Sequence, residues 1–334
     1  GLETLLPVAR ELQRAGAVPA PPVPKAVRAL GARATAAPDI VPVAPQPGST
    51  AGDVVRAAIA DGLLRLVRND AAARLRDDEA IHQMRVATRR LRSDLRTFDE
   101  LLDPEWSAGL ASELRWLGDL LGPVRDRDVE LAFLDEMAAD LRPDIDPLRE
   151  DLEARREAAR ADLLAALADP RYLDLLDRLV EAARAPMLTG RHGRPARRAL
   201  PQLARAAAVR LRRRAAKVSP DADESAYHRV RIAAKRARYA SEAVAPFIGR
   251  DGRAHSRAAR RATAVQGILG RLQDAAVLEN DTRDLLRARE GDARFAFAAG
   301  QLVGRLEGVM HEVRTAFPAA RKRLAGAAAA LQKR

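Results

Sequence analysis

The chain has 334 residues, of which 47% are hydrophobic and only 3% aromatic, and it carries a formal net charge of +12. This length and apolar content suffice for a core in two domains or in one duplicated domain, and a chain dominated by Ala, Leu and Arg is typical of helical bundles. The absence of cysteine excludes disulfides, thiolate metal sites and cysteine nucleophiles. The positive charge predicts a polyanionic partner.

The sequence predicts no membrane partner. No apolar run approaches the roughly 18 residues that a membrane span needs, and the N-terminus lacks the basic and apolar regions of a signal peptide. We therefore expect a cytoplasmic protein.

Changes in composition divide the chain into five segments. Residues 1–35 contain a short helical tail, and the prolines of residues 36–50 predict an extended linker. Thr50 followed by Asp53 indicates a capping box at the start of the first long helix. Two prolines and two glycines between 185 and 195 break every helical pattern. We predict a first helical half at 51–184, a connecting loop at 185–195 and a second helical half at 196–334.

Glycine and proline residues in the first half predict where one helix ends and the next begins. We expect a helix from about Glu105 to Leu121 that ends at Gly122 and Pro123, and a new helix that begins near Asp126.

The most informative stretch is residues 81–98. In a helix, five of its residues form one basic stripe: His82, Arg85, Arg89, Arg92 and Arg96. A second arc is apolar and should face the core: Met84, Ala87, Leu91, Leu95 and Phe98. No acidic residue occurs from Ile81 to Ser93, so neighbours in sequence cannot offset the charge. An anion is therefore expected on this face.

The same pattern recurs later in the chain. The stretch that begins at Tyr227 aligns on it with an offset of 146, and its matching positions are His228, Arg231, Lys235, Arg236 and Arg238, with Val230, Ala233 and Ala237 on the apolar face. Residues 120–129 (LLGPVRDRDV) likewise align with residues 268–277 (ILGRLQDAAV) at an offset of 148. Two motifs in the same order indicate an internal duplication. We predict an all-α fold of duplicated antiparallel helical bundles related by a pseudo-two-fold axis, which would bring both stripes to one cleft.

A helix reading H-x-x-R-[VI]-A-x-[RK]-R-x-R, present twice and followed each time by L-G-x-x-[RQ]-D, resembles the CHAD family, the conserved histidine α-helical domain. The resemblance covers residues 50–334. It implies two pseudo-symmetric helical bundles and a basic surface that binds inorganic polyphosphate without catalysis. The second copy departs at one position, where Glu242 matches Arg96. Residues 1–35 resemble more weakly the C-terminal tail of a CYTH triphosphate domain. This resemblance implies a CYTH domain as a partner, in the same chain or in another one. The acidic and basic strands of such enzymes are absent from this sequence.

The expected polyphosphate ligands are His82, Arg85, Arg89, Arg90, Arg92, Arg96, His228, Arg231, Lys235, Arg236, Arg238 and Tyr239, with Arg210, Arg214 and Lys217 as a further basic run. Arginine suits this task because its planar fork can hold two phosphate oxygens. A solvated face or internal ion pairs remain the alternative for the stripes. For the two histidines, a structural hydrogen bond is the alternative to a phosphate contact.

Other classes of site find less support. Asp126, Asp128 and Asp274 follow presumed helix starts, where capping or pairing with a stripe arginine is favoured over a metal site. We expect no cofactor, no metal site and no catalytic residue. A nucleic-acid binder is the competing function, although aromatic side chains for base stacking are scarce. Targeting to polyphosphate granules would follow from the preferred function.

Overall fold

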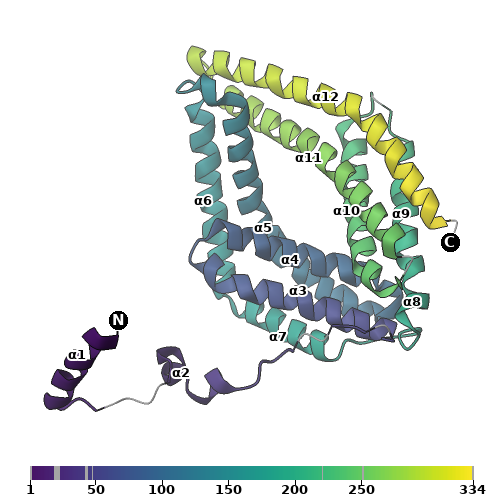
Figure 1. Cartoon of the computed structure of the whole chain (residues 1–334). Coiled ribbons are helices and arrows are strands. Elements are labelled where there is room, and N and C mark those ends of the chain that lie inside the picture. Colours follow the sequence, from purple (N-terminus) through teal and green to yellow (C-terminus); the bar gives the residue numbers. More distant parts are fainter. Residues whose placement is uncertain are drawn as a thin grey trace. The chain divides into compact units, whose positions relative to one another are not determined.

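The computed structural model describes residues 2–18, 23–41, 44–46, 48–219, 221–249 and 252–332. Helices dominate throughout (Figure 1). In the described ranges the only β-type pairings are two isolated bridges, Thr50 with Pro195 and Leu102 with Leu188, so the expected all-α class is confirmed. No helix in those ranges combines the length and the apolar character that crossing a membrane requires.

Residues up to Val41 form a unit of their own. Its described residues form two short helices and a 3-10 turn: α1 (Leu2–Arg14), α2 (Lys25–Leu30) and η1 (Gly31–Thr35). No helix is present from 36 to 49 in the described residues, and positions 42, 43 and 47 of the expected linker lie outside them.

The first half of the remaining unit consists of consecutive helices that pack against one another: α3 (Ala51–Arg74), α4 (Asp78–Thr97), η2 (Asp99–Leu101), α5 (Pro104–Ala138), η3 (Ala139–Leu141), α6 (Asp146–Ala168) and α7 (Pro170–Arg184). Helix α3 begins with the expected capping box, in which Thr50 and Asp53 each accept a hydrogen bond from the backbone of the other. Aspartates 77, 103 and 169 cap α4, α5 and α7, and each accepts one hydrogen bond from a backbone N–H in the first turn of its helix.

The second half repeats this order of helices: α8 (Ala196–Ala199), α9 (Pro201–Ala216), α10 (Glu224–Val244), η4 (Ala245–Phe247), α11 (Gly252–Ala288) and α12 (Ala293–Gln332). Helices α9, α10, α11 and α12 pack in sequence, as α3, α4, α5 and α6 do. The long α12 also packs on α9, whereas in the first half that task falls to α7, which packs on α3.

Proline marks this difference between the halves. Pro318 follows Pro170 at the offset of 148 that also relates the LG motifs. Pro170 lies in the first turn of α7, directly after α6 ends, while Pro318 lies inside α12. One continuous helix of 40 residues therefore corresponds to the pair α6 and α7.

The expected helix stop at Gly122 and Pro123 is wrong. Helix α5 continues through both residues to Ala138, and α11 continues through the equivalent Gly270. Tertiary packing overrides the local signal because Leu117, Leu121 and Val124 on either side are fully buried.

The loop at 185–195 connects the two halves and contacts the first one closely. The N–H groups of Ala51 and Gly52 donate hydrogen bonds to the carbonyls of Arg194 and His192, and Asp103 N–H donates to Met187. A Cβ atom at Gly52 would lie 2.8 Å from the Cδ1 atom of Leu188, so a larger residue there would force the Leu188 side chain to shift.

We expect Pro123→Ala to stabilise the fold by about 1–2 kcal/mol. Proline removes an interior helix hydrogen bond and clashes with the preceding turn, at a cost of up to about 3 kcal/mol, partly offset by its stiffer unfolded chain. Pro123 is exposed, so little packing is lost. The matched control is Pro170→Ala at a helix start, where proline is favourable. Equal or lower thermal stability of the Pro123 variant relative to this control would contradict the prediction.

Candidate functional site

Helices α4 and α10 carry the repeated cations, and capping and burial hold both helices in place. The carboxylates of Asp77 and Asp223 each accept a hydrogen bond from the backbone N–H three residues further on. The expected apolar faces are buried: Met84, Ala87, Leu91, Leu95 and Phe98 at α4, and Val230, Ala233 and Ala237 at α10. Because the core holds these faces, the cations on the other faces keep defined positions.

Four cations from the two helices lie close enough to interact electrostatically, and we call them the central cluster: Arg85, Arg89, Arg231 and Lys235. Burial lowers the pKa of Lys235 to about 7, and the guanidinium groups of the other three add to this effect. Burial also lowers the pKa of Arg231. In the described part of the chain, no carboxylate lies within 4 Å of Arg89, Arg231 or Lys235. The cluster therefore holds positive charge that the protein itself only partly offsets.

Two aspartates at the edge of the central cluster supply this partial offset. Arg85 forms an ion pair of 2.8 Å with Asp126 in α5. Asp274 in α11 lies near Arg231, which opposes the rise in the pKa of Asp274 that burial causes. Both aspartates lie inside long helices, so the expectation of helix capping is wrong, whereas pairing with a stripe arginine is confirmed for Asp126. Asp128 instead pairs with arginines of α5 and α6.

The two histidines lie beside equivalent residues of the LG motif, but within the described residues His82 is half-buried with a buried Nδ1 that has no hydrogen-bond partner, whereas His228 is exposed. Burial and the nearby Arg125 lower the pKa of His82, so His82 is neutral at neutral pH. His228 Nδ1 lies 2.5 Å from Gln273 Oε1. Arg125 and Gln273 match each other at the offset of 148, as Asp126 and Asp274 do. The duplication therefore recurs in tertiary contacts, and a structural hydrogen bond is the better reading for His228.

Tyr239 lies where α4 meets α10, and it organises several arginines. Its hydroxyl accepts a hydrogen bond of 2.9 Å from Arg89 Nε, and the guanidinium groups of Arg89, Arg90 and Arg238 lie over its ring at 4.5–5.9 Å. The side chain is only 4% exposed. Tyr239 therefore orients Arg89 rather than presenting a free surface to a ligand.

Arg90 is already occupied by carboxylates. It pairs with Asp94 at 3.1 Å and with Glu242 at 2.8 Å, and Glu242 also approaches Arg238 at 3.6 Å. Glu242, which replaces the last arginine of the stripe in the second copy, thus lies where α10 meets α4. We leave Arg90 and Arg238 out of the ligand set, because their charge serves the contact between the two helices.

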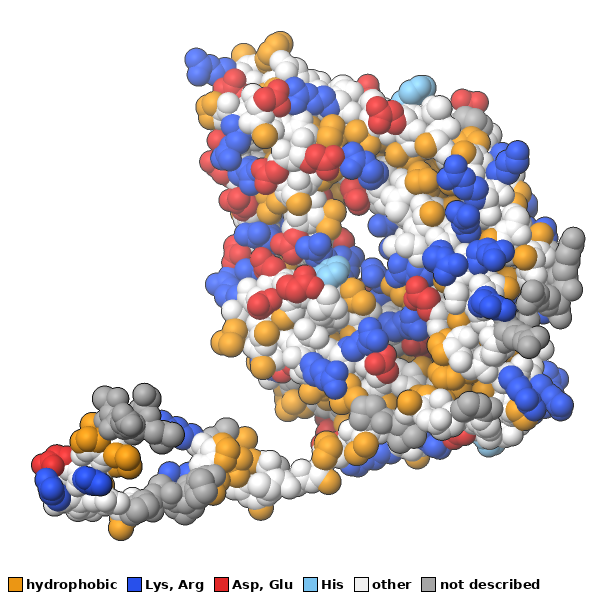
Figure 2. All heavy atoms as spheres, in the orientation of Figure 1, with side chains coloured by type: hydrophobic (Ala, Val, Ile, Leu, Met, Phe, Trp, Pro, Cys, Tyr) orange, Lys and Arg blue, Asp and Glu red, His pale blue; other side chains and the backbone are white. Residues whose placement is uncertain are grey.

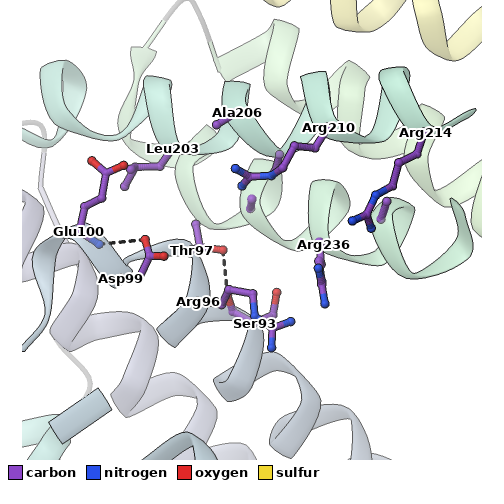
Figure 3. A pocket seen from close by; sticks show the side chains of 13 residues that line it. Ser93, Arg96, Thr97, Asp99, Glu100, Leu203, Ala206, Arg210, Arg214 and Arg236 are labelled. Carbon is purple, nitrogen blue, oxygen red and sulfur yellow. Dashed lines mark hydrogen bonds between the residues drawn. The ribbon is translucent and has the colours of Figure 1, made fainter. Parts of the chain in front are cut away.

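The remaining expected residues fall outside the central cluster. Arg96, Arg210, Arg214 and Arg236 line a separate pocket between α4, α9 and α10 (Figure 3). Arg92 approaches α5, where Arg115 adds to the burial that lowers its pKa. Lys217 is exposed at the end of α9 and belongs to neither group.

Sequence reasoning missed Arg125 beside His82 and Arg115 beside Arg92. Arg125 lies within the repeated LG motif, and this position in the motif could have identified it as a site residue. No sequence pattern identifies Arg115, because its contact with Arg92 depends on how α4 packs on α5. No three His, Asp or Glu side chains of the described ranges gather in a way that could hold a metal ion.

Charge is distributed unevenly between the halves. Residues 51–184 contain 30 acidic and 21 basic residues, whereas residues 185–334 contain 13 acidic and 32 basic residues. Figure 2 shows acidic side chains along α5 and α6 and basic side chains around the hollow near the middle of this face. Net positive charge is therefore concentrated in the second half of the chain.

Comparisons with known proteins agree with this architecture. Two solved structures share the fold: PptA from Streptomyces chartreusis, with a TM-score of 0.66, 24% identity and coverage of 82% of this chain and 100% of that chain, and the CHAD domain from the plant Ricinus communis, with a TM-score of 0.65, 28% identity and coverage of 85% and 94%.

Two uncharacterized proteins of Mycobacterium tuberculosis, Rv2226 and MT2285, are 33% and 32% identical to this chain over 286 residues, or 81% of its length. The chain spans about half the length of these curated relatives, 52% in each case. The sequence model of the CHAD domain matches residues 57–283, and it does not reach residues 1–35, whose resemblance to a CYTH tail stays a prediction. The chain belongs to the CHAD domain family.

Proposed function

We propose that the protein binds inorganic polyphosphate at the central cluster, without catalysis. One observation carries this proposal: Arg89, Arg231 and Lys235 converge from two duplicated helices, and no carboxylate of the described chain lies within 4 Å of them. Cations held together at a partly buried position raise the free energy of the empty site. A bound polyanion removes that cost, and a chain of phosphates can reach all of them at once.

The arrangement suits phosphate oxygens better than a base-reading function. Arginine forks hold phosphate oxygens in pairs, and an ammonium group such as Lys235 adds a point charge. Nucleic-acid binders that accept single strands add exposed aromatic platforms. The two tyrosines near the motifs, Tyr227 and Tyr239, are only 1% and 4% exposed. This burial favours polyphosphate over a nucleic acid.

Binding without hydrolysis fits the composition of the cluster. Enzymes that cleave phosphoanhydrides commonly hold a metal ion between convergent carboxylates. Here the converging groups are cations, and Asp126 is already paired with Arg85. We propose that the domain holds the polymer and so brings its chain to polyphosphate granules in the cytoplasm.

The direct test titrates the purified chain with long-chain polyphosphate and follows binding at several salt concentrations. We expect binding that weakens steeply with salt, because counterions leave the polymer when it meets the cluster. Duplex DNA or RNA at equal phosphate concentration should fail to displace the polymer, and added Mg²⁺ or Mn²⁺ should release no phosphate. Displacement by nucleic acid would favour the competing function, and phosphate release would show an enzyme.

Removing either half of the central cluster should weaken binding. We expect at least about a tenfold loss for Arg85→Ala with Arg89→Ala, and a similar loss for Arg231→Ala with Lys235→Ala, since each charge-assisted contact contributes roughly 1.5–3 kcal/mol. The salt dependence should also become less steep, by about 0.7 in logarithmic slope for each lost contact.

A matched control for both double variants is Arg283→Ala with Arg287→Ala. It removes two charges that already pair with Glu279 and Asp284 on the same helix. We expect affinity close to that of the wild type. Equal losses in all three double variants would show that net charge alone matters, and no loss in one cluster variant would contradict a site shared by both helices.

Affinity should fall as the pH rises above about 7. In the free protein the pKa of Lys235 is about 7, and a bound phosphate raises it. Binding then takes up a proton, so the affinity is highest below pH 7, where Lys235 is already charged, and decreases by up to about tenfold per pH unit until the pKa of the bound form is reached. Titrations of a long polymer between pH 6 and 9 measure this slope.

Lys235→Arg provides the control for this pH dependence, because a guanidinium stays charged throughout the range. The variant should bind with little change between pH 7 and 9. A slope equal to that of the wild type would show that another group titrates.

A further inference from the structure

A second group of unpaired cations lies apart from the central cluster. Four arginines from three helices line one cavity of about 430 Å³: Arg96 of α4, Arg210 and Arg214 of α9, and Arg236 of α10. In Figure 3, Arg210 and Arg214 extend from α9 toward the space above Arg236. Within the described residues, none of the four has a carboxylate within 4 Å.

The four arginines lie close enough to one another to interact electrostatically. Burial lowers the pKa of Arg236, and the guanidinium groups of Arg96, Arg214 and Arg210 lower it further. On each helix the arginines stand opposite buried apolar positions such as Leu91, Ala208 and Ala234. The core therefore holds the three helices in an arrangement that keeps these like charges together.

The two ends of the pocket carry charges of opposite sign. Asp99 and Glu100 lie at the end away from Arg214, and Asp99 accepts a hydrogen bond from the backbone of Glu100 (Figure 3). Ser93 and Thr97 lie between, and the Thr97 hydroxyl donates to the Ser93 carbonyl. An anion would therefore occupy the arginine end and leave the acidic end free.

We infer that this pocket is a distinct site for a short oligophosphate group, such as tripolyphosphate or the end of a polyphosphate chain. Its volume falls in the range of small-ligand sites, far below what a long polymer fills. An end phosphate carries roughly −1.5 to −2 near neutral pH, more than an internal one, and four guanidinium forks match this density.

The test measures tripolyphosphate binding to the full chain by calorimetry. We expect Arg210→Ala with Arg214→Ala to weaken it at least tenfold. The matched control is Arg212→Ala with Arg213→Ala, which removes the same charge from the same helix but from positions outside the cavity, and it should bind within about twofold of the wild type. Equal effects of both pairs, or no binding by the wild type, would overturn the proposal.

The central cluster serves as the second comparison. Arg231→Ala with Lys235→Ala should leave tripolyphosphate binding within a fewfold of the wild type while it loses the long polymer. If the wild type binds tripolyphosphate at the pocket but no long polymer, the function proposed above fails and the pocket stands. If the cluster variant loses tripolyphosphate as fully as the pocket variant, the pocket is not a separate site.

Competition then identifies the source of the group. If the pocket holds the end of a polymer, long polyphosphate added at an equal concentration of chain ends should displace tripolyphosphate. The variant that lacks Arg210 and Arg214 should then lose affinity for these chain ends as it does for tripolyphosphate. Persistence of bound tripolyphosphate would assign the pocket to a free short oligophosphate.

Discussion

The crowding of like charges where α4 meets α10 is the constraint on which the site depends. The core fixes both helices by their apolar faces, so Arg89, Arg231 and Lys235 cannot move apart without loss of packing. Burial then weakens their solvation, and the pKa of Lys235 falls to about 7. The free energy of folding therefore holds these like charges together against their electrostatic repulsion. A bound anion would reduce that repulsion.

The surrounding groups adjust this potential rather than cancel it. Asp126 pairs with Arg85, and Asp274 lies near Arg231 at the equivalent place in the second half. Tyr239 holds Arg89 by a hydrogen bond and by its ring. Each half of the central cluster therefore has one aspartate nearby. Such an aspartate can orient the arginines, and the cluster still keeps a net positive charge for a ligand.

The two halves share sequence motifs and an order of packed helices, but they differ in charge and in shape. The acidic residues gather in the first half and the basic ones in the second, so the four-arginine pocket draws three of its cations from α9 and α10. The first half breaks its last helix at Pro170, whereas the second keeps one helix through Pro318. The equivalent motifs of the two halves therefore both contribute cations to the central cluster. The regions around the cluster differ between the halves in charge and in helix length.

The sequence by itself determined the helical class, the repeat, the buried faces of α4 and α10 and the cationic character of their other faces. These follow from helical periodicity, which depends only on residue spacing. It misplaced the end of the helix at Gly122 and Pro123, since burial of Leu121 and Val124 outweighs the local signal.

Only the tertiary structure decided which cations are free. Arg90 and Lys235 look alike as basic positions in the repeat, yet Arg90 meets Asp94 and Glu242 while Lys235 meets other cations. It also divided the expected ligands between a central cluster and a separate pocket. Asp94 lies four residues after Arg90 in the same helix and can be read from the sequence, but Glu242 lies 152 residues away, and the periodicity of a single helix carries no information on such a partner.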